Sequence, residues 1–457
     1  MSKTRSAYFC QSCGHESPKF LGRCPSCGEW NTFAEELLQK ESGSGWKRTG
    51  AEGAAQPKRL DEISLDRQER ISTALGEMDR VLGGGLVPGS LVLIGGEPGI
   101  GKSTLTLQSA MRMKGCKVLY VTGEESEQQI RMRAVRLGES LGDCYVLTET
   151  STQGILQHLE RMRPDLVIVD SIQTLQSQYI ESTAGSISQI RECTAELQKF
   201  AKTTATPVVL IGHITKDGQL AGPKVLEHMV DVVLQFEGDR NYGYRVLRAS
   251  KNRYGSTAEV ALFEMSDRGM REILNPSEIL ISHHEEPLSG VCIASTLEGL
   301  RPMLIEVQAL VSTAAYGTPQ RSATGFDLRR LNMLLAVLEK RSGFRLAAKD
   351  VFLNIAGGIR VDDPAIDLAV VGAVLSSAED SPLDPQVCFS GEVGLSGEVR
   401  AVSRLEQRVA EAARMGFSRM FVPRASLKGL RKAGDGLELV GVANVHQLYA
   451  RLFNLPL

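Results

Sequence analysis

The chain has 457 residues and a mass of 49.7 kDa, enough for about two to four domains of average size. Hydrophobic residues make up 42% of the chain and charged residues 23%, which excludes a protein that is disordered throughout. The formal net charge of −2 gives no sign of a nucleic-acid-binding protein, but it averages over the whole chain and does not report on local basic surfaces.

No segment of the sequence predicts export or a membrane anchor. Residues 1–6 include basic side chains, but no apolar segment follows them as it would in a secretory signal. The longest apolar stretch, residues 365–375, contains Asp367 and is shorter than the roughly 20 residues that a membrane span needs. We therefore expect a cytoplasmic protein that has no contact with a membrane.

Four of the nine cysteines lie within the first 30 residues, in two Cys-x-x-Cys pairs separated by ten residues. Two such pairs can surround one Zn²⁺ with four thiolates, and a site filled by four protein ligands is structural. A segment this short buries almost no core, so zinc would supply the folding free energy, about 10–16 kcal/mol. A redox dithiol is the alternative. The expected zinc ligands are Cys10, Cys13, Cys24 and Cys27.

Other side chains of this module leave two interpretations open. His15 follows the first cysteine pair and is more readily a bystander than a ligand. Phe20, Arg23 and Trp30 either form a miniature core or contact a nucleic acid or another protein.

Changes in composition indicate the domain boundaries. Residues 1–35 form the zinc module, and residues 36–58, which contain Ser, Gly and Ala without an apolar period, read as a flexible linker. Two larger domains follow, at residues 59–275 and 276–457, divided where Asn-Pro interrupts the pattern.

In the first larger domain, short apolar runs alternate with helical patterns, which predicts an α/β fold with a largely parallel sheet. The predicted buried strands are residues 91–94, 118–121, 166–169 and 208–211. The predicted helices are residues 102–114, 127–137, 154–162 and 188–202. The second larger domain mixes strands with amphipathic helices, among them residues 328–340 and 404–415.

Residues 96–103 read Gly-Glu-Pro-Gly-Ile-Gly-Lys-Ser and fit the pattern G-x-x-x-x-G-K-[ST] at every fixed position. The predicted strand before them and helix after them are the context that a phosphate-binding loop requires. We expect Lys102 to reach the β- and γ-phosphates of ATP and Ser103 to bind Mg²⁺. The expected nucleotide-binding residues are Gly95, Gly96, Glu97, Pro98, Gly99, Ile100, Gly101, Lys102, Ser103 and Thr104.

Carboxylates follow two of the other predicted strands. Asp170 ends the run 166–169 and either holds Mg²⁺ through its water shell or caps the next segment. Glu124 and Glu125 follow the strand 118–121, and either one orients the attacking water or both place charge at a helix N-terminus. We prefer Glu124 as the general base because it lies nearer the strand end.

Taken in order, these motifs resemble the RecA-like ATPases and, over essentially the whole chain, the bacterial RadA (Sms) family. The family signature Lys-Asn-Arg-Phe-Gly occurs here with Tyr in place of Phe, and residues 123–133 are similar to the DnaB pattern, whose catalytic Glu falls on Glu124. The signature residues are Lys251, Asn252, Arg253, Tyr254 and Gly255.

The resemblance implies a DNA-dependent ATPase in homologous recombination and in repair after DNA damage. It further implies a homo-hexameric ring that moves on single-stranded and branched DNA and promotes branch migration together with the RecA recombinase. ATP, Mg²⁺ and Zn²⁺ are the implied cofactors.

Lys251 and Arg253 are separated by one residue and would point the same way along an extended strand. They could stabilise charge on the γ-phosphate in the site of a neighbouring subunit, as an arginine finger does, or bind DNA phosphates. A solvated basic turn before Gly255 is the simpler alternative.

The resemblance also implies γ-phosphate sensors and DNA loops. His213, at the end of the strand 208–211, and Gln173, just beyond Asp170, are the candidate sensors. A strand-end imidazole with satisfied hydrogen bonds and no sensing role is the alternative for His213. The polar segments 173–185 and 215–224 are the expected pore loops. Their natural contacts to DNA phosphates are Lys216 and Lys224.

The second larger domain resembles the proteolytic domain of Lon, with a strand-turn pattern at residues 390–399. The serine and lysine of the Lon dyad fall on Ala365 and near Glu406, so neither chemical group is present. We therefore expect an inactive α/β scaffold for ring assembly and DNA contact. Its basic side chains, either solvated or lining a channel, include Arg321, Arg329, Arg330, Lys340, Arg341 and Arg345.

Two other functions remain open at this stage. An ATP-dependent protease would account for the Lon-like domain but lacks the dyad. A nucleotide-switched signalling ring would account for the ATPase domain but gives no reason for a zinc module.

Overall fold

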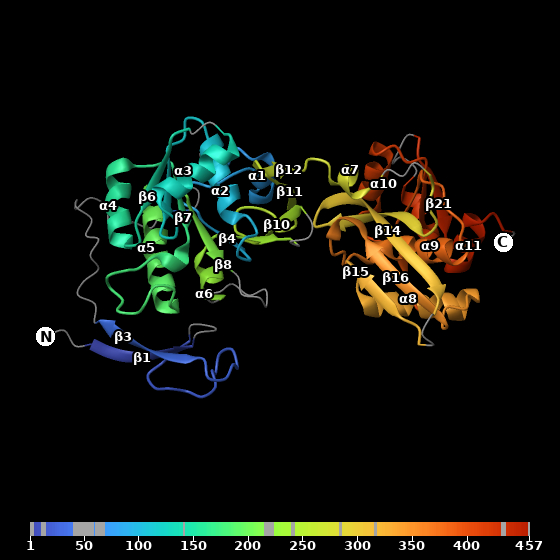
Figure 1. Cartoon of the computed structure of the whole chain (residues 1–457), viewed down its shortest axis with the longest axis horizontal. Helices are drawn as coiled ribbons and strands as arrows, with labels where there is room; N and C mark the ends of the chain where they lie inside the picture. Colours follow the sequence, from blue (N-terminus) through green and yellow to red (C-terminus); the bar gives the residue numbers. More distant parts are fainter. Residues whose placement is uncertain are drawn as a thin grey trace. The chain divides into compact units, whose positions relative to one another are not determined.

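The computed structural model divides into two compact units, Met1–Glu272 and Ile273–Leu457, and each is described by itself (Figure 1). This division falls close to the predicted boundary after residue 275. In the part of the chain described here, no helix is long and apolar enough to cross a membrane. The structure describes residues 4–10, 15–39, 59, 69–139, 142–213, 224–238, 243–282, 286–314, 318–430 and 436–455.

The N-terminal module is a three-stranded antiparallel sheet, β2-β1-β3, formed by β1 (Thr4–Cys10), β2 (Glu16–Ser17) and β3 (Phe33–Gln39). β3 pairs with β1 along its full length, from Cys10 opposite Phe33 to Thr4 opposite Gln39. The strand thus continues past residue 35, where the linker was expected to begin. The rest of that linker, residues 40–58, lies outside the described residues.

The first unit contains a nine-stranded sheet in the order β12-β11-β10-β9-β4-β8-β7-β5-β6. The six strands from β9 to β6 run parallel, and β10 to β12 extend the sheet as an antiparallel edge. The strands are β4 (Leu91–Gly96), β5 (Val118–Thr122), β6 (Cys144–Thr148), β7 (Leu166–Asp170), β8 (Val208–His213), β9 (Val232–Glu237), β10 (Tyr244–Asn252), β11 (Val260–Ser266) and β12 (Gly269–Glu272).

Alternate residues of each central strand enter two different cores. Val92 and Ile94 of β4 pack on the side of α1, α2 and α3, whereas Leu91 and Leu93 pack on the side of α4, α5 and α6. Each buried aliphatic side chain contributes about 1.5–3 kcal/mol, which explains the continuous apolar runs in the sequence. The helices are α1 (Gly76–Leu82), α2 (Lys102–Arg112), α3 (Glu127–Leu137), α4 (Thr152–Met162), α5 (Ile187–Thr204) and α6 (Lys224–Met229).

Strand register gathers the predicted polar residues at one edge of this sheet. Gly96 at the end of β4 lies opposite His213 at the end of β8, and Thr122 of β5 lies opposite Asp170 of β7. Ligands of open parallel sheets bind outside the carboxyl ends of the strands, so the fold itself places a site at this edge.

The second unit contains a seven-stranded mixed sheet in the order β15-β16-β14-β13-β17-β20-β21. The predicted strand-turn pattern at residues 390–399 is confirmed as a short hairpin of β18 (Glu392–Val393) and β19 (Val399–Arg400). The sheet strands are β13 (Val291–Glu298), β14 (Arg301–Thr313), β15 (Arg321–Thr324), β16 (Lys349–Ile355), β17 (Val387–Phe389), β20 (Arg419–Pro423) and β21 (Glu438–Val442). The helices are α7 (Pro276–Leu280), α8 (Leu328–Ser342), α9 (Asp367–Ala378), α10 (Leu405–Arg414) and α11 (Val445–Leu452).

Ala365, where the Lon serine would fall, is fully buried on a short 3₁₀ turn, Pro364–Ile366. Glu406, near the expected lysine, is exposed on α10. Beside Ala365 lies an ion pair instead, in which Arg408 Nη2 donates to Asp363 Oδ2 over 2.7 Å. Arg408 is fully buried and also donates to the carbonyl of Ser295 over 2.8 Å.

Arg330 corrects one expectation about the basic side chains of this unit. Its guanidinium donates to the fully buried Asp367 over 2.6 Å and lies 3.7 Å from Glu392. Arg330 therefore joins α8 to the start of α9, so it is neither a solvated helix side chain nor a free channel cation.

We expect Arg408→Ala to destabilise the second unit by about 3–5 kcal/mol, because it leaves a partly buried carboxylate without its cation. The matched control is Arg419→Ala, which breaks an ion pair with Glu438 whose partners are 45% and 64% exposed. Such a surface pair contributes about 1 kcal/mol or less. Urea titration of the full chain, followed by hydrogen exchange in peptides from residues 273–457, measures both losses. Equal losses for the two variants would contradict the assignment.

Candidate active site and metal centre

The cysteine sulfurs of the N-terminal module are arranged as metal ligands. Those of Cys10, Cys24 and Cys27 all lie within 4.8 Å of one another, and the Cys10 and Cys27 sulfurs are 3.7 Å apart. A tetrahedral zinc with Zn–S bonds of about 2.3 Å would place its sulfurs about 3.8 Å apart, so the observed cluster fits the ion. Cys13, the fourth predicted ligand, lies outside the described residues.

Backbone bonds shape the turns that carry these cysteines. The amide of Gly28 donates to the carbonyl of Cys24 over 2.9 Å, and the amide of Cys10 donates to that of His15 over 3.0 Å. The His15 ring lies edge-on to Phe33, with ring centroids 6.4 Å apart, which suits a packing role.

Phe20 and Trp30 do not form the miniature core of the module. They are 53% and 66% exposed, whereas the buried members of the module's hydrophobic cluster are Cys10, Cys24 and Phe33. The core interpretation of these two aromatic residues was therefore wrong. The Arg23 guanidinium lies 5.6 Å from the centroid of the Trp30 ring.

The phosphate-binding loop joins β4 to α2, as predicted. Gly99 and Gly101 have φ angles of 79° and 114°, which residues with a Cβ rarely adopt. A Cβ on Gly96 would lie 2.6 Å from the carbonyl oxygen of Phe236, so only glycine fits there. The loop is thus a glycine-built cradle that ends at the N-terminus of α2, where backbone amides favour an anion.

Lys102 is buried at the floor of this loop. Its Nζ donates to the carbonyls of Gly96 over 2.7 Å and Glu97 over 2.9 Å. Burial lowers the pKa of Lys102 to about 8, although the charges of Asp170, Glu124 and Glu97 act in the opposite direction. A phosphate anion at the loop would compensate a charge that burial disfavours, so these residues fit a nucleotide.

The neighbouring strand ends bring acidic residues to the same edge. Asp170 is buried and accepts a 2.6 Å bond from the hydroxyl of Tyr120. Glu124 accepts a 2.6 Å bond from the hydroxyl of Ser171, the residue that follows Asp170.

The two candidate bases differ in their partners. Glu125 pairs with Arg133 of α3, whereas Glu124 is held beside Asp170 through Ser171 and acts on the pKa of Lys102. Because Arg133 engages the Glu125 carboxylate, the geometry favours Glu124 as the residue that orients water.

The structure places some of the predicted sensors and leaves others outside its description. Gln173 lies on the 3₁₀ turn Ile172–Thr174 directly after Ser171, at the edge that holds Asp170. His213 ends β8 opposite Gly96, but its side chain and that of Lys224 lie outside the described residues. Lys216 also lies outside them.

The family signature lies at the other edge of the sheet. Lys251 and Asn252 end β10, where Asn252 is opposite Val232, the first residue of β9. Val232 in turn pairs with Val92, near the start of β4. The signature thus lies beside the start of β4, whereas the phosphate loop follows the end of β4. At roughly 3.3 Å per residue, the two ends of this strand, Leu91 and Gly96, are about 17 Å apart, so the signature does not reach the phosphate loop of its own chain.

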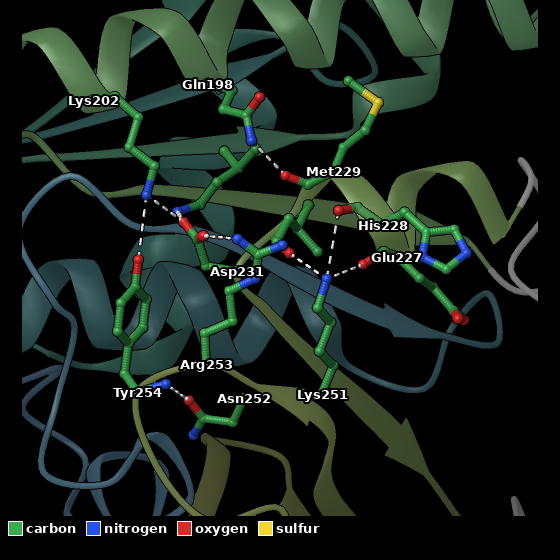
Figure 2. A network of polar contacts seen from close by, with 12 residues as sticks. Gln198, Lys202, Glu227, His228, Met229, Asp231, Lys251, Asn252, Arg253 and Tyr254 are labelled. Atoms are coloured by element: carbon green, nitrogen blue, oxygen red, sulfur yellow. Dashed lines mark hydrogen bonds and ion pairs between the residues drawn. The ribbon is translucent and has the colours of Figure 1, made fainter.

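Figure 2 shows what the signature contacts instead. Lys251 Nζ donates to the carbonyls of Glu227 over 2.6 Å and Val230 over 2.9 Å, at the end of α6. Arg253 Nη1 lies 3.6 Å from Asp231 Oδ1. Both cations therefore approach the same turn, as residues on one side of the chain should.

Some residues that organise this region were missed by sequence reasoning. Asp231 directly precedes the apolar strand β9, and an isolated acid at that position was a usable signal. Lys202 of α5 and Arg70 carried no local signal. Lys202 donates to the Tyr254 hydroxyl over 3.2 Å, and Arg70 donates to the Tyr254 carbonyl over 2.7 Å. Arg245 was also missed, although its Nε donates to the carbonyl of Ile100 in the phosphate loop.

We expect Cys24→Ser to lose bound zinc, because a hydroxyl does not replace a thiolate ligand, and the N-terminal module to unfold as a result. Zinc per chain, measured by elemental analysis after dialysis, is the readout. The control is Cys116→Ser, which changes a partly buried cysteine just before β5, outside the cluster. Full zinc content in Cys24→Ser would disprove the metal assignment.

We expect nucleotide affinity to fall above about pH 8. The free protein loses the Lys102 proton near its pKa of about 8, whereas phosphate binding requires the ammonium, so binding takes up a proton at higher pH. Affinity should decrease by up to about tenfold per pH unit there and become level below about pH 7, where Lys102 is almost fully protonated.

Calorimetric titration with Mg-ADP between pH 7 and 9.5 measures this slope. Lys102→Arg is the control, because a guanidinium stays charged over the whole range and should flatten the profile. The same affinity of the parent chain at both pH limits would show that the Lys102 proton is not linked to binding.

Three family models match successive parts of the chain. They are described as "Rubredoxin metal binding domain" over residues 8–35, "AAA domain" over residues 56–219 and "Subunit ChlI of Mg-chelatase" over residues 312–426. The predicted fold class is thereby confirmed: a zinc ribbon, a RecA-like P-loop core and a C-terminal Lon-protease-like α/β domain. A solved structure, "Crystal structure of the RadB recombinase", is 24% identical with a TM-score of 0.36, and the match covers 44% of this chain and 99% of that one.

Relatives match almost the full length. DNA repair protein RadA of Bacillus subtilis is 51% identical over 451 residues, which cover 97% of the chain and 98% of that protein. The proteins of the same name from Halalkalibacterium halodurans and Listeria monocytogenes are 47% and 46% identical, over 97% of the chain and 98% and 97% of their own lengths. The resemblance seen in the motifs is confirmed, and the chain belongs to the family of DNA repair protein RadA.

Proposed function

We propose that the chain is a DNA-dependent ATPase that acts in homologous recombination and DNA repair. In this proposal it forms a homo-hexameric ring, moves along single-stranded and branched DNA, and promotes branch migration with the RecA recombinase. Its relatives carry the name DNA repair protein RadA, which supports the process. The ring is supported by the position of the signature cations. They lie at the amino ends of the parallel strands, away from the phosphate loop of their own chain, which is at the carboxyl ends.

Within one subunit, the loop amides and Lys102 would hold the phosphates, while Ser103 and Asp170 would hold Mg²⁺. Bound Mg-ATP supplies the phosphoryl group that is transferred to water. Glu124 would orient that water and accept its proton, since it lies beside Asp170, whereas Glu125 is paired with Arg133. The carboxylate stays in place because the Ser171 hydroxyl holds it.

A neighbouring subunit would complete the site with Lys251 and Arg253. Arg253 is 58% exposed and its distance to Asp231 is long, so its guanidinium is available to a phosphate from another chain. Cations supplied across a subunit boundary stabilise charge on the transferred phosphoryl group and make hydrolysis depend on ring packing.

DNA contact is assigned to the segments that leave the carboxyl edge of the sheet. Gln173 and His213 would sense the γ-phosphate there, and residues 215–224, with Lys216 and Lys224, would contact DNA phosphates. Because such contacts release counterions, binding should weaken as the salt concentration rises. The C-terminal domain would serve as a scaffold, since the Ala365 methyl group cannot act as a nucleophile.

We expect single-stranded DNA to raise the ATP hydrolysis rate of the purified chain, with less stimulation at higher salt. Lys251→Ala should reduce the stimulated rate at least tenfold while leaving Mg-ADP affinity of the isolated subunit within about twofold, because the cation acts on another subunit's site. The assay follows phosphate release with and without DNA.

Three outcomes would count against the proposal. An ATPase rate that DNA leaves unchanged at every salt concentration would remove the motor function. Loss of nucleotide binding in Lys251→Ala would refute a role across the subunit boundary. ATP-stimulated cleavage of casein would restore the protease alternative.

A further inference from the structure

The signature is anchored at residues 227–231, which are the last residues of α6 and the two residues before β9, and we call this segment the α6–β9 turn. Lys251 binds its carbonyls, Arg253 faces its carboxylate, and the backbone amide of Arg253 donates to the carbonyl of Asp231 over 3.1 Å. Gln198 of α5 donates to the carbonyl of Met229 and fixes the turn from the other side (Figure 2).

Lys251 is bound to the end of a helix. The last carbonyls of α6 have no partner in the next turn of helix and carry partial negative charge, so an ammonium there satisfies them and stabilises the helix end. A β-bulge between Ala249 and Lys251 in the pairing of β10 with β9 changes the direction of the strand at this point. The residues that precede α6 are the segment to which we assign DNA contact.

Asp231 fixes the turn to the central strand. Its Oδ2 accepts a 3.0 Å bond from the amide of Leu91, and its own amide donates to the carbonyl of Leu91 over 2.9 Å. Leu91 is the first residue of β4, whose last residues begin the phosphate loop. The anchor of the signature and the nucleotide site are therefore the two ends of one buried strand.

Lys202 of α5 links this carboxylate to the signature. Its Nζ lies 2.7 Å from Asp231 Oδ2 and 3.2 Å from the Tyr254 hydroxyl. Burial would raise the pKa of Asp231, but the bonds from Lys202 and Leu91 outweigh it and the pKa lies below its ordinary value. Asp231 is thus a fixed negative charge, 3% exposed, between two cations.

We propose that Asp231 and Lys202 are positioning residues, which hold Lys251 and Arg253 at the α6–β9 turn so that DNA-induced movement of α6 is transmitted to both cations. The proposal rests on the proposed function, because it takes Lys251 and Arg253 to act in a neighbouring site and the segment before α6 to bind DNA. Neither positioning residue contacts a phosphate. Each acts through the signature.

Asp231 is held more firmly at the α6–β9 turn than the two cations are. This difference is required if Lys251 and Arg253 are to move to a phosphate while Asp231 keeps its position. Asp231 is buried and bonded to β4, so it stays in place. Arg253 is more than half exposed and lies 3.6 Å away, so it can leave for a phosphate. Lys251 is released when the carbonyls at the end of α6 move, because those carbonyls supply its hydrogen bonds within the subunit.

The test compares Asp231→Asn and Lys202→Met with the parent chain in the full-length protein. Asn retains an acceptor for the Leu91 amide but removes the charge, and Lys202 is 47% exposed, so its replacement leaves the fold intact. Lys202→Arg is the conservative variant. Glu237→Gln, which removes a half-exposed carboxylate paired with Arg248 in the same sheet, is the matched control.

The measurements are kcat and KM for ATP with and without single-stranded DNA, and DNA affinity with a non-hydrolysable ATP analogue. We expect Asp231→Asn and Lys202→Met to lower DNA-stimulated kcat at least tenfold, with KM and DNA affinity within about twofold of the parent. Lys202→Arg should restore at least half of the stimulation, and Glu237→Gln should match the parent.

The outcomes separate this inference from the proposed function. If DNA does not stimulate the parent chain, the proposed function fails and the inference fails with it. If DNA stimulates the parent and both Lys202→Met and a folded Asp231→Asn equally, only the positioning role is overturned. Equal losses in KM, kcat and DNA affinity, without rescue by Lys202→Arg, would indicate a merely structural role and would also overturn it.

Discussion

The burial of β4 at the centre of the sheet is the constraint on which the rest of the first unit depends. Its neighbours β8 and β9 cover both edges, and the two cores cover both faces, so the strand cannot shift without breaking its register. At one end its direction changes into the phosphate loop, and at the other Leu91 holds Asp231. A rigid strand of about 17 Å therefore sets the distance between the place where phosphates bind and the place where the signature is anchored.

A buried charge lies near each end of this strand, Lys102 at one end and Asp231 at the other. Burial and hydrogen bonding contribute differently to the pKa of each. The Lys102 ammonium donates to the carbonyls of Gly96 and Glu97, and burial outweighs the nearby carboxylates, so its pKa falls to about 8. Asp231 meets Lys202 and a backbone amide, so bonding dominates and its pKa falls because the charged form is favoured. The site of Lys102 therefore favours binding of an anion, whereas Asp231 already has Lys202 as its counter-ion and keeps its geometry.

A phosphate loop and a cysteine cluster could be located from the sequence because each is encoded in a short stretch of chain. The four buried strands of the core were predictable for the same reason: burial on both faces leaves a continuous apolar run. β6 was missed because it lies at the edge of the sheet and its residues are only partly buried, which removes that signal.

Contacts between distant segments could not be read from the sequence. Lys202 approaches Tyr254 and Asp231 from α5, and Arg408 meets Asp363 from α10, through pairings that only the folded sheet brings about. The sequence placed the family signature correctly as a pair of cations with a common direction. It could not show that the end of α6 receives them, because this depends on the register of β9 and β10.

The net charge of −2 reflects nearly equal numbers of basic and acidic residues, 52 and 54, and several of the cations lie in pairs with defined partners. Arg330 and Arg408 are balanced by Asp367 and Asp363 inside the second unit, and Lys202 is balanced by Asp231 in the first. A positive charge that is already paired adds nothing to the long-range attraction of DNA, and screening removes the effect of distant surface charges beyond about 8–10 Å. A cation that is only weakly paired within this chain is therefore the one that remains able to bind a phosphate of DNA or of a nucleotide on a second subunit. Among the signature residues this is Arg253, exposed and 3.6 Å from a carboxylate that is fixed elsewhere.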